Sequence, residues 1–120
     1  MKLETHHIND TKVAEVISEN PVISSTEDGL DLLGNLYYQG FDKIIIHAKN
    51  VTPAFFDLKN GMAGEILQKF SNYRVRLAIV DNFSKYSGKR VSEFISESNR
   101  NRQVNFVATQ AEALNALAGK

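Results

Sequence analysis

Polar side chains that could carry chemistry follow the most apolar runs of this sequence. His47 and Asn50 come after Ile44–Ile46, Asp81 comes after residues 77–80, and Thr109 follows residues 104–108. If these runs are parallel strands, their carboxyl ends share one edge of a sheet, where ligands of α/β proteins tend to bind. His47 and Asp81 would then form an acid–base pair, provided that their strands are neighbours. The alternative is that His47 only ends a strand and bonds to loop backbone.

A second candidate is the polar segment 84–90, which precedes a predicted helix. Ser84, Lys85 and Ser87 supply hydroxyls and a cation. Such groups at a helix N-terminus can hold a phosphate or another anion. The alternative is an ordinary solvated loop in which Ser87 caps the helix, because this composition is common in exposed loops.

His6 and His7 are adjacent and suggest a metal site, but their spacing argues against one. Neighbouring residues on a strand point to opposite faces of the sheet, so these two imidazoles do not chelate one ion. No cysteine is present, and the third histidine is His47. We therefore expect no metal and no cofactor.

The elements that must position these residues centre on a strand–helix–strand unit. Residues 43–47 and 74–80 read as strands, and both contain consecutive apolar residues, which is typical of parallel strands covered on two faces. Between them, an apolar residue recurs every three or four positions, so we predict a helix over residues 53–73. Thr52 followed by Pro53 marks its start, and Asp57 offers a second cap that would separate the first turn.

The flanking segments extend this unit into one domain over residues 1–120. Residues 2–8 and 12–17 predict an antiparallel hairpin. Helices are predicted after Ser24–Thr26, around Val91 and after Thr109, where capping residues precede apolar stripes. The predicted fold is a single α/β domain of order ββαβαβαβα, with a mixed sheet whose later strands are parallel and about four helices.

The composition of the chain argues against several classes of function. The chain has 14 basic and 14 acidic residues in 120, so a general nucleic-acid or anionic-membrane binder is not expected. Residues 1–10 are polar, and no apolar run approaches transmembrane length. Together with the lack of cysteine, this predicts a cytoplasmic location with no signal peptide.

A partner surface is predicted on the helix that follows His47. Gly61 and Gly64 would share one helix face, and each weakens a helix by about 1 kcal/mol relative to alanine. Either a neighbouring element packs close to this bare backbone or a partner docks there. Phe55 and Phe56 lie about 100° apart on a helix, so one of them is expected to be exposed and to anchor a homodimer or another protein.

Several segments together resemble a bacterial family described only as a domain of unknown function. They are 55–58 (FFDL), 63–70 (AGEILQKF), 73–80 (YRVRLAIV), 83–86 (FSKY) and 94–99 (FISESN). The resemblance covers nearly the whole chain. It implies a fold and no activity.

The element order also resembles the STAS domain, the fold of anti-sigma-factor antagonists. That family places a phosphorylated serine or threonine in an Asp-Ser-x-Gly segment. The equivalent stretch here is Asp57-Leu58-Lys59-Asn60-Gly61, in which Leu58 occupies the hydroxyl position. The resemblance implies the architecture of a regulatory module without its phosphorylation switch.

The function expected from these observations is a non-catalytic regulatory or protein-interaction module. The alternative is a small-molecule or anion-binding domain, or a small enzyme, with its site at the carboxyl ends of the parallel strands. An exposed apolar patch on the helix after His47 would favour the first. A concave site at the strand ends that contains His47 would favour the second.

Overall fold

The computed structural model describes residues 1–82 and 88–118 and has one mixed sheet at its centre. Its strands are β1 (Lys2–Ile8), β2 (Thr11–Ile17), β3 (Lys43–His47), β4 (Arg76–Val80) and β5 (Val104–Val107). They lie in the order β1-β2-β3-β4-β5. β1 and β2 are antiparallel, and each later neighbour is parallel to the one before it. The predicted fold class and element order are confirmed.

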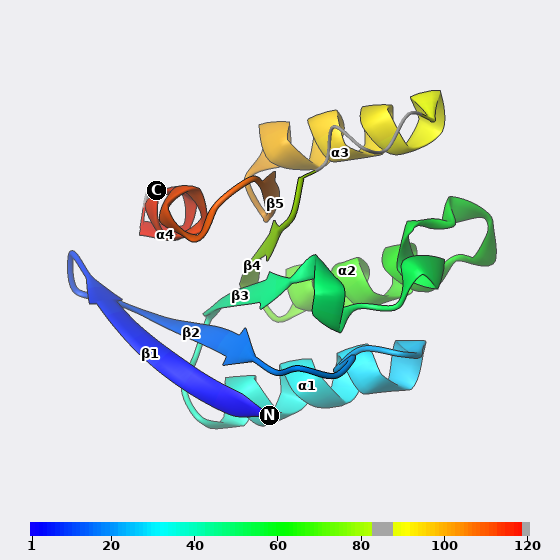
Figure 1. The fold of residues 1–120 in the computed structure, drawn as a ribbon. Helices are drawn as coiled ribbons and strands as arrows, with labels where there is room; N and C mark the ends of the chain where they lie inside the picture. The colour runs from blue at the N-terminus through cyan, green and yellow to red at the C-terminus, as the bar shows by residue number, and fades with distance from the viewer. Residues whose placement is uncertain (83–87, 119–120) are drawn as a thin grey trace.

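Helices cover the two faces of the sheet unequally (Figure 1). The helices α1 (Thr26–Tyr38), α2 (Met62–Asn72) and α3 (Lys89–Asn101) contribute to the larger core, which includes Leu33, Ile66 and Phe70. The helix α4 (Gln110–Ala118) lies on the opposite face, where Ala113 and Leu117 pack on Val13, Ile45 and Ala78. Right-handed crossovers between parallel strands explain why α1, α2 and α3 share one face.

The hairpin β1–β2 turns through Asn9 and Asp10. Both residues have positive φ, 48° and 65°. A two-residue loop with this conformation is a type I′ turn, and its twist matches that of the flanking strands. Asparagine and aspartate tolerate the left-handed region better than other non-glycine residues, which explains this local sequence.

The segment after β3 differs from the predicted helix over residues 53–73. It contains three short 3₁₀ helices, η1 (Ala48–Asn50), η2 (Pro53–Phe56) and η3 (Leu58–Asn60), and only then α2. Gly61 interrupts the helical pattern because its φ is +77°, in the left-handed region. Asp57 caps η3 by accepting a hydrogen bond from Lys59 N–H, as the second capping residue in the sequence suggested.

This interruption removes two observations on which the predicted partner surface rested, the exposed phenylalanine and the shared glycine face. Phe55 and Phe56 are both buried, with 1% and 7% of their surface exposed, and their rings meet edge to face. Adjacent residues of a 3₁₀ turn lie about 120° apart, so helix geometry alone does not bury both rings. The Phe56 ring also packs against Phe106, with 6.3 Å between ring centroids. Gly61 precedes α2, so it does not share a helix face with Gly64. A Cβ added to Gly64 would meet nothing within 4 Å, so no described element approaches that glycine closely.

Candidate functional site

His47 and Asp81 do not form the predicted acid–base pair. His47 lies opposite Val80 in the β3–β4 register, and Asp81 is the next residue along the chain. Because side chains alternate along a strand, His47 and Asp81 point to opposite faces of the sheet. The acid that His47 contacts is instead Glu15 on β2, where His47 Nε2 lies 2.7 Å from Glu15 Oε2.

Glu15 of β2 gathers side chains from three other elements on the face that α4 covers. His6 Nε2 of β1 lies 2.8 Å from Glu15 Oε1, and Gln110 Nε2 at the start of α4 donates to the same oxygen. With His47 on β3, both carboxylate oxygens are engaged. An ionised carboxylate only accepts hydrogen bonds, so each imidazole carries its proton on Nε2. We call His6, Glu15, His47 and Gln110 the Glu15 cluster.

The electrostatics of the Glu15 cluster favour the ionised carboxylate. Only 3% of the surface of Glu15 is exposed. Burial raises the pKa of Glu15, the hydrogen bonds from His47, Gln110 and His6 lower it, and the net pKa lies below the ordinary value for glutamate. The cluster therefore ties β1, β2, β3 and α4 together, and its carboxylate is largely closed to solvent.

His6 and His7 occupy opposite faces of β1, as the strand geometry predicted. His6 contacts Glu15, whereas His7 is exposed and lies opposite Lys12 in the register. Among residues 1–82 and 88–118, no group of three or more histidine, cysteine, aspartate or glutamate side chains is arranged to hold a metal ion.

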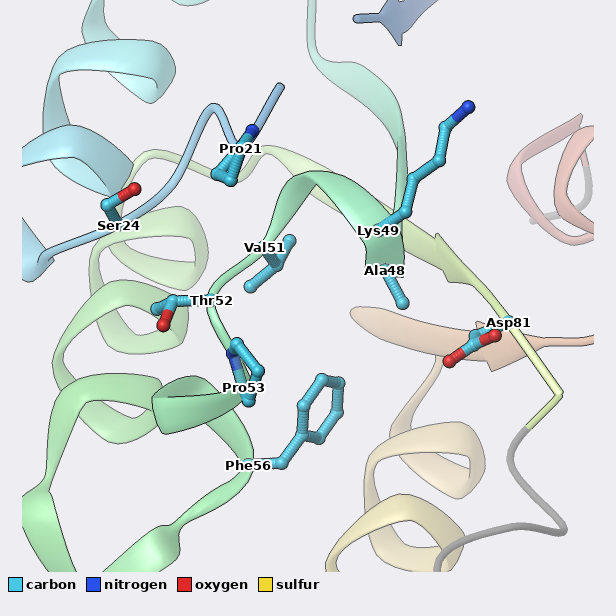
Figure 2. A pocket seen from close by; sticks show the side chains of 9 residues that line it. All are labelled: Pro21, Ser24, Ala48, Lys49, Val51, Thr52, Pro53, Phe56 and Asp81. Atoms are coloured by element: carbon cyan, nitrogen blue, oxygen red, sulfur yellow. The ribbon is translucent and has the colours of Figure 1, made fainter. Parts of the chain in front are cut away.

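The face of the sheet opposite the Glu15 cluster has a pocket at the carboxyl ends of β3 and β4 (Figure 2). We call it the strand-end pocket. It has a volume of about 410 Å³. Its lining comes from the β2–α1 connection, the 3₁₀ segments and the end of β4: Pro21, Ser24, Ala48, Lys49, Val51, Thr52, Pro53, Phe56 and Asp81. The Asp81 carboxylate points toward the space between Ala48 and Phe56, whereas Lys49 extends away from it (Figure 2).

Asn50 lies between Lys49 and Val51, which line this pocket, and it holds the backbone there in place. Its side chain is fully buried, and its Nδ2 donates to the backbone carbonyls of Ser18 and Asn20, both at 2.8 Å. The Asn50 carbonyl accepts from the N–H groups of Val22 and Ile23. Asn50 therefore fixes the β2–α1 connection against the end of β3 through its Nδ2. Its buried Oδ1 has no hydrogen-bond partner among the described residues, and ligand binding by Asn50 stays a prediction.

The predicted site residues thus separate into three groups. Asp81 lines the strand-end pocket, His47 belongs to the Glu15 cluster, and Asn50 is a buried support. Ser84, Lys85 and Ser87 lie outside the described residues. The sequence reasoning missed Glu15, although a charged residue within the apolar run of residues 13–17 was a usable signal, since such a residue is seldom buried without partners.

Three exposed tyrosines form a different surface at the opposite end of the molecule. Tyr37 and Tyr38 end α1, and Tyr73 follows α2. The Tyr37 and Tyr73 rings lie 5.3 Å apart between centroids, and 91% of the Tyr38 surface is exposed. We call these residues the tyrosine patch. Tyr37 lies outside the buried stripe of α1, which is formed by Gly29, Leu32, Leu33 and Leu36.

A comparison with protein-family models shows the family to which this chain belongs. The model described as "Domain of unknown function (DUF4180)" matches residues 8–117. The chain belongs to this family. Membership of the DUF4180 family agrees with the resemblance to a domain of unknown function, and the family description assigns no activity. The match lends no support to the STAS resemblance, for which the element order remains the basis.

Two further comparisons add only fold information. None of the curated proteins matches the sequence. A solved structure titled "NMR Structure of the protein TM1081" is similar with a TM-score of 0.50 at 16% identity, and the match covers 100% of this chain and 91% of that chain. At this identity, the likeness concerns the fold alone. Within the described part of the chain, no helix has the length and apolarity needed to cross a bilayer.

Proposed function

We propose that this member of the DUF4180 family is a non-catalytic regulatory module that binds a small polar molecule in the strand-end pocket. The observation that carries the proposal is the position of the pocket, at the carboxyl ends of two parallel strands. Open α/β sheets bind ligands at this edge because the loops that follow the strands converge there.

The lining of the pocket indicates the class of ligand. The Asp81 carboxylate and the hydroxyls of Ser24 and Thr52 can pair with hydroxyl or amino groups, whereas Pro53, Val51 and Phe56 supply an apolar wall. A molecule with a hydrogen-bonding end and a small apolar part fits this combination. A volume of about 410 Å³ lies within the range of small-ligand sites.

The described lining argues for binding without reaction. It includes no histidine or cysteine, and Asp81 is its single carboxylate. An activated serine or threonine requires an adjacent base within hydrogen-bond reach, and the nearest histidine of the sheet, His47, is engaged with Glu15 on the other face.

NMR spectra of the protein, recorded with each candidate ligand, test the proposal. The wild type is screened against a panel of amino acids, nucleosides, sugars and small carboxylic acids. We expect a binder whose backbone amide shifts concentrate on residues 48–52 and Asp81. Ser24→Trp should abolish binding because the indole fills the pocket, whereas Asn35→Trp, on the exposed surface of α1, should leave it unchanged. A panel without binders, or shifts that concentrate elsewhere, would contradict the proposal.

The tyrosine patch supports a second candidate, a protein-interaction module. Tyrosine is enriched at protein interfaces because its ring buries a large area while its hydroxyl remains hydrogen-bonded. Tyr37 and Tyr73 present such rings together, and the neighbouring Tyr38 is almost fully exposed. In quantitative affinity purification, a genuine partner should be lost with both Tyr38→Ser and Tyr73→Ser and retained with Asn35→Ser. If every captured protein is retained by both patch variants, this candidate fails.

A further inference from the structure

β1 is a regular edge strand. All seven of its residues pair with β2, and the register runs from Lys2 opposite Ile17 to Ile8 opposite Thr11 without a bulge. β1 is the first strand in the sheet order, and within the described residues no element lies along its outer side (Figure 1). Edge strands carry unpaired backbone groups, and proteins often protect them with proline or a bulge. β1 has neither.

The turn geometry determines which backbone groups of β1 face outward. The type I′ turn at Asn9 and Asp10 makes Ile8 and Thr11 a hydrogen-bonded pair. Hydrogen-bonded and non-hydrogen-bonded pairs alternate along an antiparallel ladder. The N–H and C=O groups of Leu3, Thr5 and His7 therefore point away from β2, toward the free edge.

We propose that β1 pairs with β1 of a second copy of this chain, antiparallel and across a two-fold axis at Thr5. Thr5 then pairs with the partner's Thr5, and Leu3 with the partner's His7. Each such pair exchanges two N–H···O bonds, so all the outward groups of Leu3, Thr5 and His7 are satisfied. The two five-stranded sheets become one continuous sheet.

Side-chain complementarity selects this register and this occupant. With the axis at Thr5, Glu4 lies directly opposite the partner's His6, so no two carboxylates face each other across the pair. With the axis at Glu4, two carboxylates would face each other, and like charges directly opposite are destabilising. With the axis at His6, two imidazoles would meet and Leu3 would lose its backbone partner. A second copy offers a strand of matching length whose pattern complements β1 in this register.

Light scattering and hydrogen exchange test the pairing on the wild type. We expect a solution mass near twice 13.4 kDa at high micromolar concentration, falling toward the monomer on dilution. The amides of Leu3, Thr5 and His7 should gain protection as the concentration rises. The amides of Glu4, His6 and Ile8 should be protected at every concentration, because they bond to β2. A monomer at high concentration would overturn the proposal.

Charge variants at Thr5 give a matched test. Thr5 is exposed, so Thr5→Lys and Thr5→Glu should both fold. Each should be monomeric alone, since like charges meet at the axis, and an equimolar mixture should recover the dimer mass. Thr5→Val should remain dimeric. A dimer that persists in both charged variants, or a mixture that stays monomeric, shows that the contact lies elsewhere and refutes the β1 pairing. Because Thr5 is remote from the strand-end pocket, these results are independent of ligand binding.

Discussion

At the scale of single residues, the buried carboxylate of Glu15 is the most demanding feature of the molecule. An ionised group is costly to bury unless its hydrogen-bonding capacity is filled. Three donors from three elements fill it, and the His47 and His6 rings reach it from the strands on either side. Replacing Glu15 therefore leaves several donors without a partner. The stabilisation that the Glu15 carboxylate gives to the fold should depend on pH.

The pH dependence follows from the lowered pKa of Glu15. Because the pKa of Glu15 is lower in the folded chain, the unfolded chain binds the Glu15 proton more readily. The stabilisation is fully present above about pH 4.3, the ordinary glutamate pKa, and is lost as the pH falls through the folded-state pKa. Chemical denaturation of Glu15→Gln should show a free energy of unfolding about 2 kcal/mol lower at neutral pH. The difference from wild type should shrink below pH 4.

The exposed Glu19→Gln serves as the control for that measurement, because it removes a carboxylate without a described hydrogen bond to the cluster. It should leave unchanged both the free energy of unfolding at neutral pH and its decrease at acid pH. If the free energy of unfolding falls with pH in the same way in Glu15→Gln and wild type, the ionised carboxylate is not stabilised in the folded state.

At the scale of elements, the contact between α1 and α2 depends on one glycine. A Cβ added at Gly29 would lie 2.7 Å from Ile66 Cδ1 and 2.8 Å from Ile66 Cγ1. Ile66 is fully buried and β-branched, so it has little freedom to move away. Gly34, in the same helix, has nothing within 4 Å of such an atom.

The two glycines should therefore respond oppositely to alanine. Gly34→Ala should stabilise the protein by about 1 kcal/mol through helix propensity alone. Gly29→Ala gains the same propensity but incurs an overpacking cost of about 1–3 kcal/mol, so we expect no gain or a net loss. Thermal and urea unfolding measure both. Equal stabilisation by both substitutions would show that α1 and α2 can separate without cost.

At the scale of the whole molecule, α4 is the one helix among residues 1–82 and 88–118 that packs on the Glu15 face of the sheet. Arg76 at the start of β4 anchors the end of this helix. Its Nη1 donates to the Leu117 carbonyl at 3.2 Å, its Nη2 to the Ala116 carbonyl at 2.9 Å, and its Nε to the Arg102 carbonyl at 3.1 Å. A cation at a helix C-terminus also complements the helix dipole. Arg76 thus joins α4, β4 and the C-terminal end of α3, where Arg102 is the C-cap.

Arg76→Met keeps the aliphatic stem and removes these hydrogen bonds. We expect a loss of about 1.5–3 kcal/mol in the free energy of unfolding, the usual range for hydrogen bonds to charged groups. Hydrogen exchange should accelerate in α4 more than in α1. Arg100→Met, on the exposed surface of α3, is the matched control and should change neither. Uniform acceleration over all helices would show that α4 does not open as a separate unit.

The sequence by itself determined the elements and their order. Consecutive apolar residues in β3 and β4 require cover on both faces, and the hairpin residues Asn9 and Asp10 allow a two-residue turn. Both patterns are local, so they were readable without a structure. The order ββαβαβαβα, read from these patterns, is the order of the structure, whereas the STAS likeness rests on that order and the regulatory role it implies is a proposal.

Only the tertiary structure decided which polar residues meet. Whether His47 faces Asp81 or Glu15 depends on strand order and on the face to which each side chain points, and a shift of one residue exchanges the faces. The predicted helix is likewise broken at Asp57, which is extended, and at Gly61, which has positive φ, and both Phe55 and Phe56 are buried. Contacts between residues distant in sequence, such as Glu15 with Gln110, carry no periodic signal, because only the assembled sheet and α4 bring them within hydrogen-bond reach.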